Sequence, residues 1–292
     1  MGQQLLNGLF VGSIYALFAV GYTLVFGVLD ILNLAHQAVF MLCAFAALAL
    51  VADAHVPLWA ALPLAMIAGG VLGIVLERLA FRPLRGRADS NISGLISSLA
   101  MATVFEAIAA QVFGPDISRF PFGTFPERMI QLGSASASLL QLCIVAVAVL
   151  LMAALTWLLG HTRLGRQIRA VAESPRAARI LGIDVDRVIA VSFVLSSALA
   201  GAAGVLFGLA FNSISPDVGR SVELKGLAVI ILGGMGSVPG AVVAGFAIGL
   251  VEVFTVVRLG SSYRDAVSFA VLFVVLVLRP RGLFGRAAAR EA

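Results

Sequence analysis

Charge is the scarcest property of this chain. Only 12% of its 292 residues are Asp, Glu, Lys or Arg, whereas soluble domains carry about 25%. Apolar residues make up 61% of the chain, and the mean hydropathy is +1.05. Most apolar runs approach the ~20 residues that cross a bilayer as a helix, whereas the strands of a membrane barrel alternate over ~10 residues. The composition therefore predicts an all-α, polytopic transmembrane bundle formed by residues 1–292 as one domain.

Reactive residues are also few. The two cysteines, Cys43 and Cys143, lie inside apolar runs, and the three histidines are scattered at positions 36, 55 and 161. These positions indicate neither a disulfide nor a metal site. The sequence contains no HExxH or GxSxG motif, and its single lysine, Lys225, lacks the glycines of a phosphate-binding loop. We therefore expect no catalytic residues, no cofactor and no ATPase in this chain, so an ATP-driven process would need a separate ATPase.

Positive charge gathers in three places, although the formal net charge is only +5. One is the stretch Gly160–Arg187, and the other two are groups of arginines. Those groups are Arg78, Arg82, Arg85 and Arg87, and Arg279, Arg281, Arg286 and Arg290. The positive-inside rule places all three on the cytoplasmic side. The basic composition is thus explained by orientation in a membrane, and we expect no nucleic-acid partner.

The apolar runs between these clusters set the order of the spans. The predicted crossings are Leu5–Phe26, Ile31–Val51, Leu58–Leu76, Ile92–Phe113, Leu139–Leu159 and Val188–Phe211. A long apolar region from Leu224 to Val257 and a shorter run from Ala266 to Leu278 follow. Counting from the arginines places the N-terminus outside. The six crossings, a long region that crosses once or twice and the shorter run together predict eight or nine spans.

Small residues recur every four positions in several spans. The stripes are Gly8, Gly12 and Ala16; Ala65, Gly69 and Gly73; Ser196, Ala200, Gly204 and Gly208; and Ala241, Gly245 and Gly249. Such stripes let helix backbones approach closely within a membrane bundle. The run Leu139–Leu159 has no comparable stripe, so we expect it to face lipid.

Two of the predicted spans contain signals for a break. Four glycines and a proline fall within Gly233–Gly240, which predicts two half-helices with free backbone groups near Gly236 and Ser237. The second break lies in Gly27–Gln37, ahead of another apolar run. Irregular backbone at membrane depth is tolerated inside protein or beside a water-filled cavity, so both breaks are candidates for a transport pathway.

Polar residues accompany the second break. Asn33, His36 and Gln37 lie close together there, and polar groups inside a membrane indicate function. Glu106 and Glu252, each within an apolar region, are further candidates. Two readings stay open for the first three residues, which either line a pathway or lie hydrated at the cytoplasmic interface. The two glutamates either line the pathway or form hydrogen bonds between helices.

The stretch Gly160–Arg187 carries its own helix signals. Ser174 is a good N-cap, Pro175 suits the first helical position, and Gly182 suits a left-handed C-cap. Glu173 lies where the helix dipole favours an anion. These signals predict about two helical turns at Pro175–Leu181. The apolar side of this helix would consist of Ala177, Ile180 and Leu181.

A helix this short is marginal alone, because isolated helices need roughly 12–15 residues, so its apolar side needs a partner. Either the loop only fixes membrane orientation, or it docks on a cytoplasmic partner. The residues assigned to docking are Arg166, Arg169, Glu173, Ser174, Pro175, Arg176, Arg179, Leu181 and Gly182.

Three stretches follow one another along the chain in this order: NLAHQAVFMLCAF, AVAESPRAARILGIDVDRV and LAVIILGGMGSVPGAVVAG. Together they resemble the start, the cytoplasmic coupling loop and the glycine-rich C-terminal motif of LivH-type permeases of branched-chain amino-acid ABC transporters. The resemblance implies a multi-pass permease of a bacterial inner membrane that pairs with a related permease subunit. It further implies two cytoplasmic ATPase subunits docked on the coupling loops and a periplasmic substrate-binding protein.

The chain departs from that pattern at two positions. Gln37 replaces the glycine that usually follows the histidine, and Cys43 replaces another common glycine. Both changes place a side chain where the family has bare backbone. Relatives also carry urea, amides and aromatic acids, so branched-chain amino acids are the default substrate and not a deduction.

Combined with the resemblance, these features predict an ATP-driven mechanism. The helix at Pro175–Leu181 would move as a rigid lever, with Arg163, Arg166 and Arg169 anchoring the loop. The substrate pathway would run past Asn33, His36, Gln37, Glu106, Gly236 and Ser237. The alternative is an ion-coupled secondary transporter or channel, for which Glu106, Glu252 and His36 would be the titratable groups.

Overall fold

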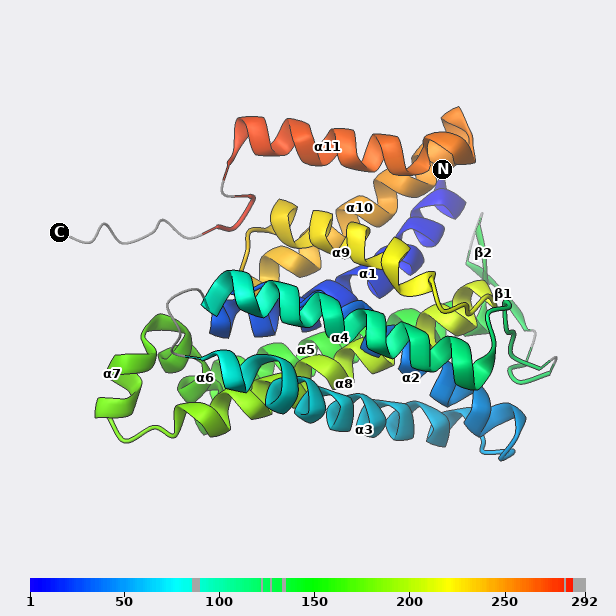
Figure 1. The fold of residues 1–292 in the computed structure, drawn as a ribbon. Coiled ribbons are helices and arrows are strands. Elements are labelled where there is room, and N and C mark those ends of the chain that lie inside the picture. The colour runs from blue at the N-terminus through cyan, green and yellow to red at the C-terminus, as the bar shows by residue number, and fades with distance from the viewer. Residues whose placement is uncertain (86–89, 122, 127, 133–134, 281, 286–292) are drawn as a thin grey trace.

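The computed structural model describes residues 1–85, 90–121, 123–126, 128–132, 135–280 and 282–285. The long helices are α1 (Gly2–Leu29), α2 (His36–Ala52), α3 (Leu58–Leu76), α4 (Ser90–Phe113), α5 (Leu139–His161), α8 (Val185–Phe211), α9 (Val218–Gly233), α10 (Val238–Leu259) and α11 (Arg264–Leu278). The short elements are η1 (Glu77–Phe81), η2 (Arg82–Leu84), β1 (Met129–Leu132), β2 (Ala135–Ser138), α6 (Arg163–Glu173), α7 (Pro175–Ile180) and η3 (Ser261–Tyr263). The predicted all-α polytopic bundle is confirmed (Figure 1).

Seven helices in the described part of the chain are long and apolar enough to cross a membrane. They are Gly2–Leu29, Leu58–Leu84, Asn91–Phe113, Leu139–His161, Val185–Phe211, Val238–Leu259 and Ser261–Leu278. Helix α2, with 17 residues, is a shorter apolar helix, and α9 has 16 residues. A count of eight or nine crossings therefore requires α2, or both α2 and α9, to cross with fewer than the usual ~20 residues.

The bundle has two distinct ends. In Figure 1, α7 lies at one end, while the N-terminus and the hairpin of β1 and β2 lie at the other. The described residues that follow α11 lie toward the α7 end. Arg85 also belongs to this end, because its Nη1 lies 3.0 Å from Asp186 Oδ1 at the start of α8. Four residues of the predicted basic clusters, namely Arg87, Arg281, Arg286 and Arg290, lie outside the described residues.

The small-residue stripes are where helices approach closely, as predicted. A Cβ added to Gly245 of α10 would lie 2.5 Å from Ala16 Cα of α1, and one added to Gly12 would lie 2.8 Å from Phe246 Cα. Helices α3 and α8 meet in the same way, since a Cβ on Gly73 would lie 2.6 Å from the carbonyl oxygen of Phe193. The absence of side chains at these positions brings the backbones together, and dispersion contacts between them hold the bundle.

Helix α5 faces lipid on one side only. Val149, Leu150 and Trp157 are exposed, whereas Ala148 and Met152 are buried against the bundle. The expectation that this run lies at the periphery is therefore right for one face. Its other face is apolar at helical spacing, so it packs without needing glycine.

Both predicted breaks are present. Helix α1 ends at Leu29, followed by Asp30 in the left-handed region (φ 54°), and α2 begins at His36. Helix α9 ends at Gly233, where Gly234 and Gly236 have φ values of 99° and 82°, and α10 begins at Val238. Only glycine adopts such backbone angles without strain. The glycine cluster thus makes a tight turn between two helices.

The backbone at the glycine-rich break, Gly233–Gly240, is not free, which corrects one expectation. The carbonyls of Leu232 and Gly233 accept hydrogen bonds from the backbone N–H groups of Leu283 (2.8 Å) and Phe284 (3.0 Å). A helix C-terminus leaves carbonyls without intrahelical partners, and here a segment near the end of the chain supplies donors for two of them. No pattern along the chain indicated this pairing, because the partners lie far apart in sequence.

Candidate functional site

The polar residues at the start of α2 are buried inside the bundle. Asn33, His36 and Gln37 are at most 3% exposed, so they are not hydrated at an open surface of this chain. Asn33 Oδ1 accepts a hydrogen bond from the backbone N–H of Ala35 (3.2 Å), which holds the turn into α2. Ser98 of α4 accepts another from the backbone N–H of Leu34 (3.1 Å). Side chains thus satisfy two of the N–H groups that precede the helix.

His36 joins three helices. Its ring centroid lies 4.8 Å from that of Phe18 and 5.2 Å from that of Tyr22, both of α1. Its Nε2 is 3.3 Å from the carbonyl oxygen of Phe18, and its Nδ1 is 3.4 Å from Ser196 Oγ of α8. Among the described residues it forms no ion pair, so the geometry suits a neutral imidazole between aromatic rings.

Gln37 and Glu106 meet in a charged network with Arg220, which sequence reasoning missed. Gln37 Nε2 donates to Glu106 Oε1 (2.8 Å), and Arg220 Nε donates to the same oxygen (3.2 Å), while Arg220 Nη2 pairs with Glu106 Oε2. The Glu106 side chain is only 10% exposed, whereas that of Arg220 is 62% exposed. This bidentate pair joins α4, α2 and α9.

Two further groups near this network were not predicted. Glu223 Oε1 and the Tyr22 hydroxyl are buried and have no hydrogen-bond partner within the described residues. The sequence indicated only one of these groups, Glu223, which directly precedes the long apolar region that begins at Leu224. Buried polar groups that lack partners are where a solute or a water would form hydrogen bonds.

The structure places Gly236 and Ser237 apart from the buried polar group. Gly236 is exposed at the turn between α9 and α10, and a Cβ added to Gly27, near the end of α1, would lie 3.7 Å from its Cα. Ser237 caps α10 by accepting a hydrogen bond from the backbone N–H of Gly240 (3.2 Å). Within the described ranges, no hydrogen bond or ion pair joins these two residues to Asn33, His36, Gln37 or Glu106.

Glu252 forms bonds between helices. It is 1% exposed, and its Oε1 accepts hydrogen bonds from Tyr15 of α1 (3.1 Å) and Lys225 of α9 (3.2 Å) and pairs with Arg264 of α11. Lys225 and Arg264 were not predicted to take part in any site.

The predicted docking segment has the expected local structure. Ser174 Oγ accepts a hydrogen bond from the backbone N–H of Ala177 (3.2 Å), Pro175 opens α7, and Gly182 has a φ of 79°. Helix α7 ends at Ile180, one residue before the predicted end. The amphipathic helix α6 precedes it and buries Gly165, Ile168 and Val171. Local sequence therefore accounts for this segment almost completely.

The expected apolar side of α7 has no partner within the described chain. Ile180 is 87% exposed and Leu181 76% exposed, and Ala177 is exposed as well, while Ala178 is the residue that packs on the bundle. The charged residues around them are also exposed; they are Arg166, Arg169, Glu173, Arg176 and Arg179. An exposed apolar pair surrounded by arginines at one end of the bundle is typical of a protein-binding surface.

Comparison with known proteins gives consistent matches. A family model described as "Branched-chain amino acid transport system / permease component" matches residues 4–276. The high-affinity branched-chain amino acid transport system permease protein BraD of Pseudomonas aeruginosa is 37% identical over 297 residues, covering 97% of this chain and 95% of that protein. The corresponding protein LivH of Escherichia coli (strain K12) is 35% identical with the same coverage.

More distant matches are partial in sequence or share only the fold. The autoinducer 2 import system permease protein LsrC of Yersinia pseudotuberculosis is 31% identical over 142 residues, covering 46% of this chain and 40% of that protein. The solved structure of PsaBC from Streptococcus pneumoniae in complex with a Fab has a TM-score of 0.52 at 10% identity, covering 94% of this chain and 91% of that one. At this identity the second match supports the fold alone.

Proposed function

The chain belongs to the family of branched-chain amino acid transport system permease components, and we propose that it is the membrane-spanning subunit of an ABC importer for branched-chain or related hydrophobic amino acids. One observation carries the proposal. The identity to BraD and LivH extends over 95% of the length of each, so it covers a whole permease and not one shared segment.

In this proposal, the chain transports and partner chains hydrolyse ATP. Two cytoplasmic ATPase subunits, a related permease subunit and a periplasmic substrate-binding protein complete the importer in a bacterial inner membrane. The exposed surface on α7 supports an ATPase partner. Ile180 and Leu181 would enter an apolar groove of the ATPase, while Arg176 and Arg179 pair with its acidic residues. Because α7 packs on the bundle through Ala178 and on α6, a push on it is transmitted to α8.

The substrate pathway proposed from the sequence passes Asn33, His36, Gln37 and Glu106 and leaves the bundle near Gly236 and Ser237. The burial of the first four supports it, as do Nδ2 of Asn33 and Oε1 of Gln37, which have no hydrogen-bond partner among the described residues. Both atoms could bond to a passing zwitterion, whose ammonium and carboxylate need acceptors and donors. A weakly polar pathway suffices when a binding protein selects the substrate.

The test is co-purification of this chain with its candidate ATPase subunits. The variant carries Arg176→Glu, Arg179→Glu and Leu181→Asp, and the control carries Arg258→Glu, an exposed position on α10. We expect the ATPase to be lost from the triple variant and retained by the control, with both proteins still folded in detergent. Equal recovery with the triple variant would show that α7 does not dock the ATPase.

A secondary transporter is the second candidate, because Glu106, Glu252 and His36 are buried within the bundle. Uptake of L-leucine at fixed ATP, measured while the proton gradient is collapsed, separates the two mechanisms. An ABC importer keeps its uptake, whereas an ion-coupled transporter loses it. Autoinducer 2, urea, amides and aromatic acids, added as competitors to the same assay, test the substrate class.

A further inference from the structure

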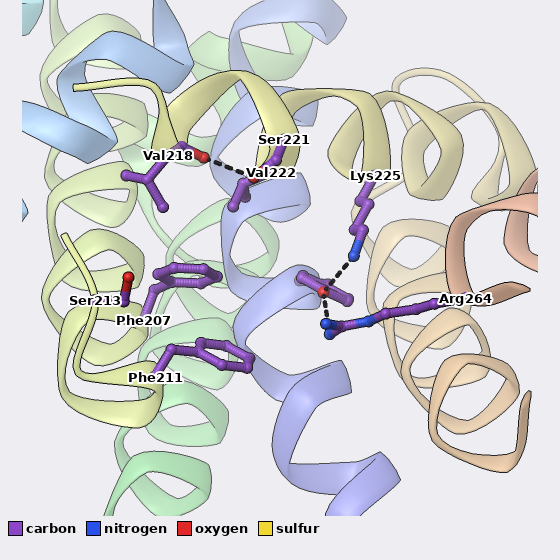
Figure 2. A pocket seen from close by; sticks show the side chains of 9 residues that line it. Phe207, Phe211, Ser213, Val218, Ser221, Val222, Lys225 and Arg264 are labelled. Carbon is purple, nitrogen blue, oxygen red and sulfur yellow. Dashed lines mark hydrogen bonds between the residues drawn. The ribbon is translucent and has the colours of Figure 1, made fainter. Parts of the chain in front are cut away.

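A cavity of about 330 Å³ lies among α1, α8, α9 and the start of α11. Figure 2 shows the residues that surround it, among them Phe207, Phe211, Val222, Lys225 and Arg264. The α8 residues lie near the C-terminus of that helix, which is distant from α7 (Figure 1). Ser221 is exposed and Phe211 is 36% exposed, so the cavity opens to the surface.

The walls of this cavity have opposite character. Phe207 and Phe211 lie on one side, and Lys225 and Arg264 reach in from the other (Figure 2). The ring centroids of the two phenylalanines are 4.5 Å apart, so they form a continuous apolar surface. Among the described residues, those of the lining include no carboxylate. A small solute with an anionic end and an apolar end would therefore fit in one orientation only.

The two cations that line the cavity, Lys225 and Arg264, are bound by neighbouring side chains. Lys225 Nζ lies 3.2 Å from each of Glu252 Oε1, the Tyr15 hydroxyl and Asp265 Oδ1. These three partners account for all three of its N–H donors. Glu252 and Asp265 do not line the cavity, yet they neutralise much of the positive charge and fix the position of the ammonium group. Lys225 thus contributes positive potential to the cavity without a free donor.

Arg264 has N–H donors that are not used by the described residues. Its Nε pairs with Glu252, and its Nη2 donates to the Tyr15 hydroxyl (3.4 Å). Its Nη1 makes no hydrogen bond or ion pair with any described residue. A guanidinium carries five N–H donors in a planar fork that matches a carboxylate. The side chain is 33% exposed and lines the cavity, so this edge is available to a solute.

The volume of the cavity limits the size of the solute that it can bind. Ligand pockets span about 300–1,000 Å³, so this cavity is at the lower limit and suits a molecule of few heavy atoms. The hydroxyls of Ser213 and Ser221 in the lining can accept hydrogen bonds from an ammonium group. A hydrophobic amino acid has a carboxylate for Arg264, an ammonium for the serines and an apolar side chain for the phenylalanines.

We propose that this cavity is a substrate subsite, in which Arg264 binds the carboxylate of a small hydrophobic amino acid and Phe207 and Phe211 contact its side chain. The inference rests on the proposed function and adds a recognition element to it. It separates the residues that recognise the solute from those of the deeper pathway around His36. The subsite is the first that a solute meets on the side distant from α7.

The experiment is calorimetric titration of the full chain in lipid nanodiscs with three probes. L-leucine has both charged groups, 4-methylpentanoate has only the carboxylate, and L-leucinamide has only the ammonium. We expect L-leucine and 4-methylpentanoate to bind and L-leucinamide to bind at least tenfold more weakly. A charge-assisted hydrogen bond accounts for roughly that factor.

Three variants locate the binding. Arg264→Lys keeps the positive charge beside Glu252 but removes the planar fork, and we expect it to weaken L-leucine binding roughly tenfold. Ser221→Trp fills the cavity, and we expect it to abolish binding, whereas Leu224→Trp places the same side chain at an exposed position of α9 outside the lining and should bind as wild type. The Trp pair leaves the Glu252 network intact, so it remains informative if Arg264→Lys folds poorly.

The outcomes distinguish this inference from the proposed function. Equal affinity for L-leucinamide, unchanged binding by Ser221→Trp, or binding of none of the probes would overturn the subsite, while ATP-driven leucine uptake would still support the importer. Binding of 4-methylpentanoate but not of L-leucine, with loss in Ser221→Trp, would support a carboxylate subsite and contradict the assignment to amino acids.

Discussion

At the scale of single residues, the interior of this protein is organised by three cations that sequence reasoning did not place. Arg220, Lys225 and Arg264 each neutralise a glutamate that is almost completely buried. An isolated carboxylate in such surroundings would cost several kcal/mol, so each pair fixes which helices lie together. The two glutamates concerned, Glu106 and Glu252, belong to α4 and α10.

The pair of Arg220 and Glu106 gives a direct prediction. Arg220→Met leaves Glu106 with only the neutral Gln37 as a partner, and we expect it to lower the free energy of unfolding by about 1–3 kcal/mol. Glu106→Gln should cost less, because the mostly exposed Arg220 can be hydrated instead. Thermal unfolding in detergent measures both, with the exposed Arg258→Met as control. Greater loss in Glu106→Gln than in Arg220→Met would contradict this account.

At the scale of elements, the bundle depends on which glycines meet a neighbouring backbone. Gly245 of α10 lies against Ala16 of α1, whereas no atom of the described residues lies within 4 Å of the Cβ position of Gly160, near the end of α5. Both are helical and cannot be told apart by residue type alone. Only the spacing of the stripe around Gly245 indicated the difference.

This contrast is testable with a matched pair. Gly245→Ala should force α1 and α10 apart and destabilise the protein by about 1–3 kcal/mol, because overpacking costs that much in a close interface. Gly160→Ala should be neutral or stabilising by about 0.4–1 kcal/mol, since alanine loses less backbone entropy on folding. Thermal unfolding of the two variants and of wild type measures both effects on stability. Equal melting temperatures for the two variants would refute the packing argument.

At the scale of the whole molecule, the features that could be predicted from the sequence were those that depend on contacts between residues close together in the chain. Ser174, Pro175 and Gly182 define α7 through contacts within a few residues, and the glycines of 233–240 end α9 for the same reason. Glu106 and Arg220 lie 114 residues apart, and no pattern along the chain pairs them. The hairpin of β1 and β2 was not predicted either. The Gln3 side chain forms hydrogen bonds with the backbone of Ser136 and so holds α1 against this hairpin. Contacts between distant segments arise from packing, which a single sequence does not show.

The orientation of the molecule is a further prediction at this scale. Ile180→Cys and Ser261→Cys place exposed thiols at opposite ends, in a Cys143→Ala background where the remaining Cys43 is buried. In spheroplasts that lack the ATPase, an impermeant thiol reagent should label Ser261→Cys at once and Ile180→Cys only after the membrane is opened. The reverse pattern would invert the topology.

The position of α1 at the centre of the bundle has a consequence for biosynthesis. It is the most completely buried of the candidate spans, yet Tyr15 on it bonds to Glu252, 237 residues later in the chain. At a translation rate of about 5–20 residues per second, α1 waits on the order of 10–50 s for α10. During that interval its small-residue stripe faces lipid or another nascent chain. Helix α1 is therefore made well before its native neighbour α10, and assembly errors should concentrate at its surface.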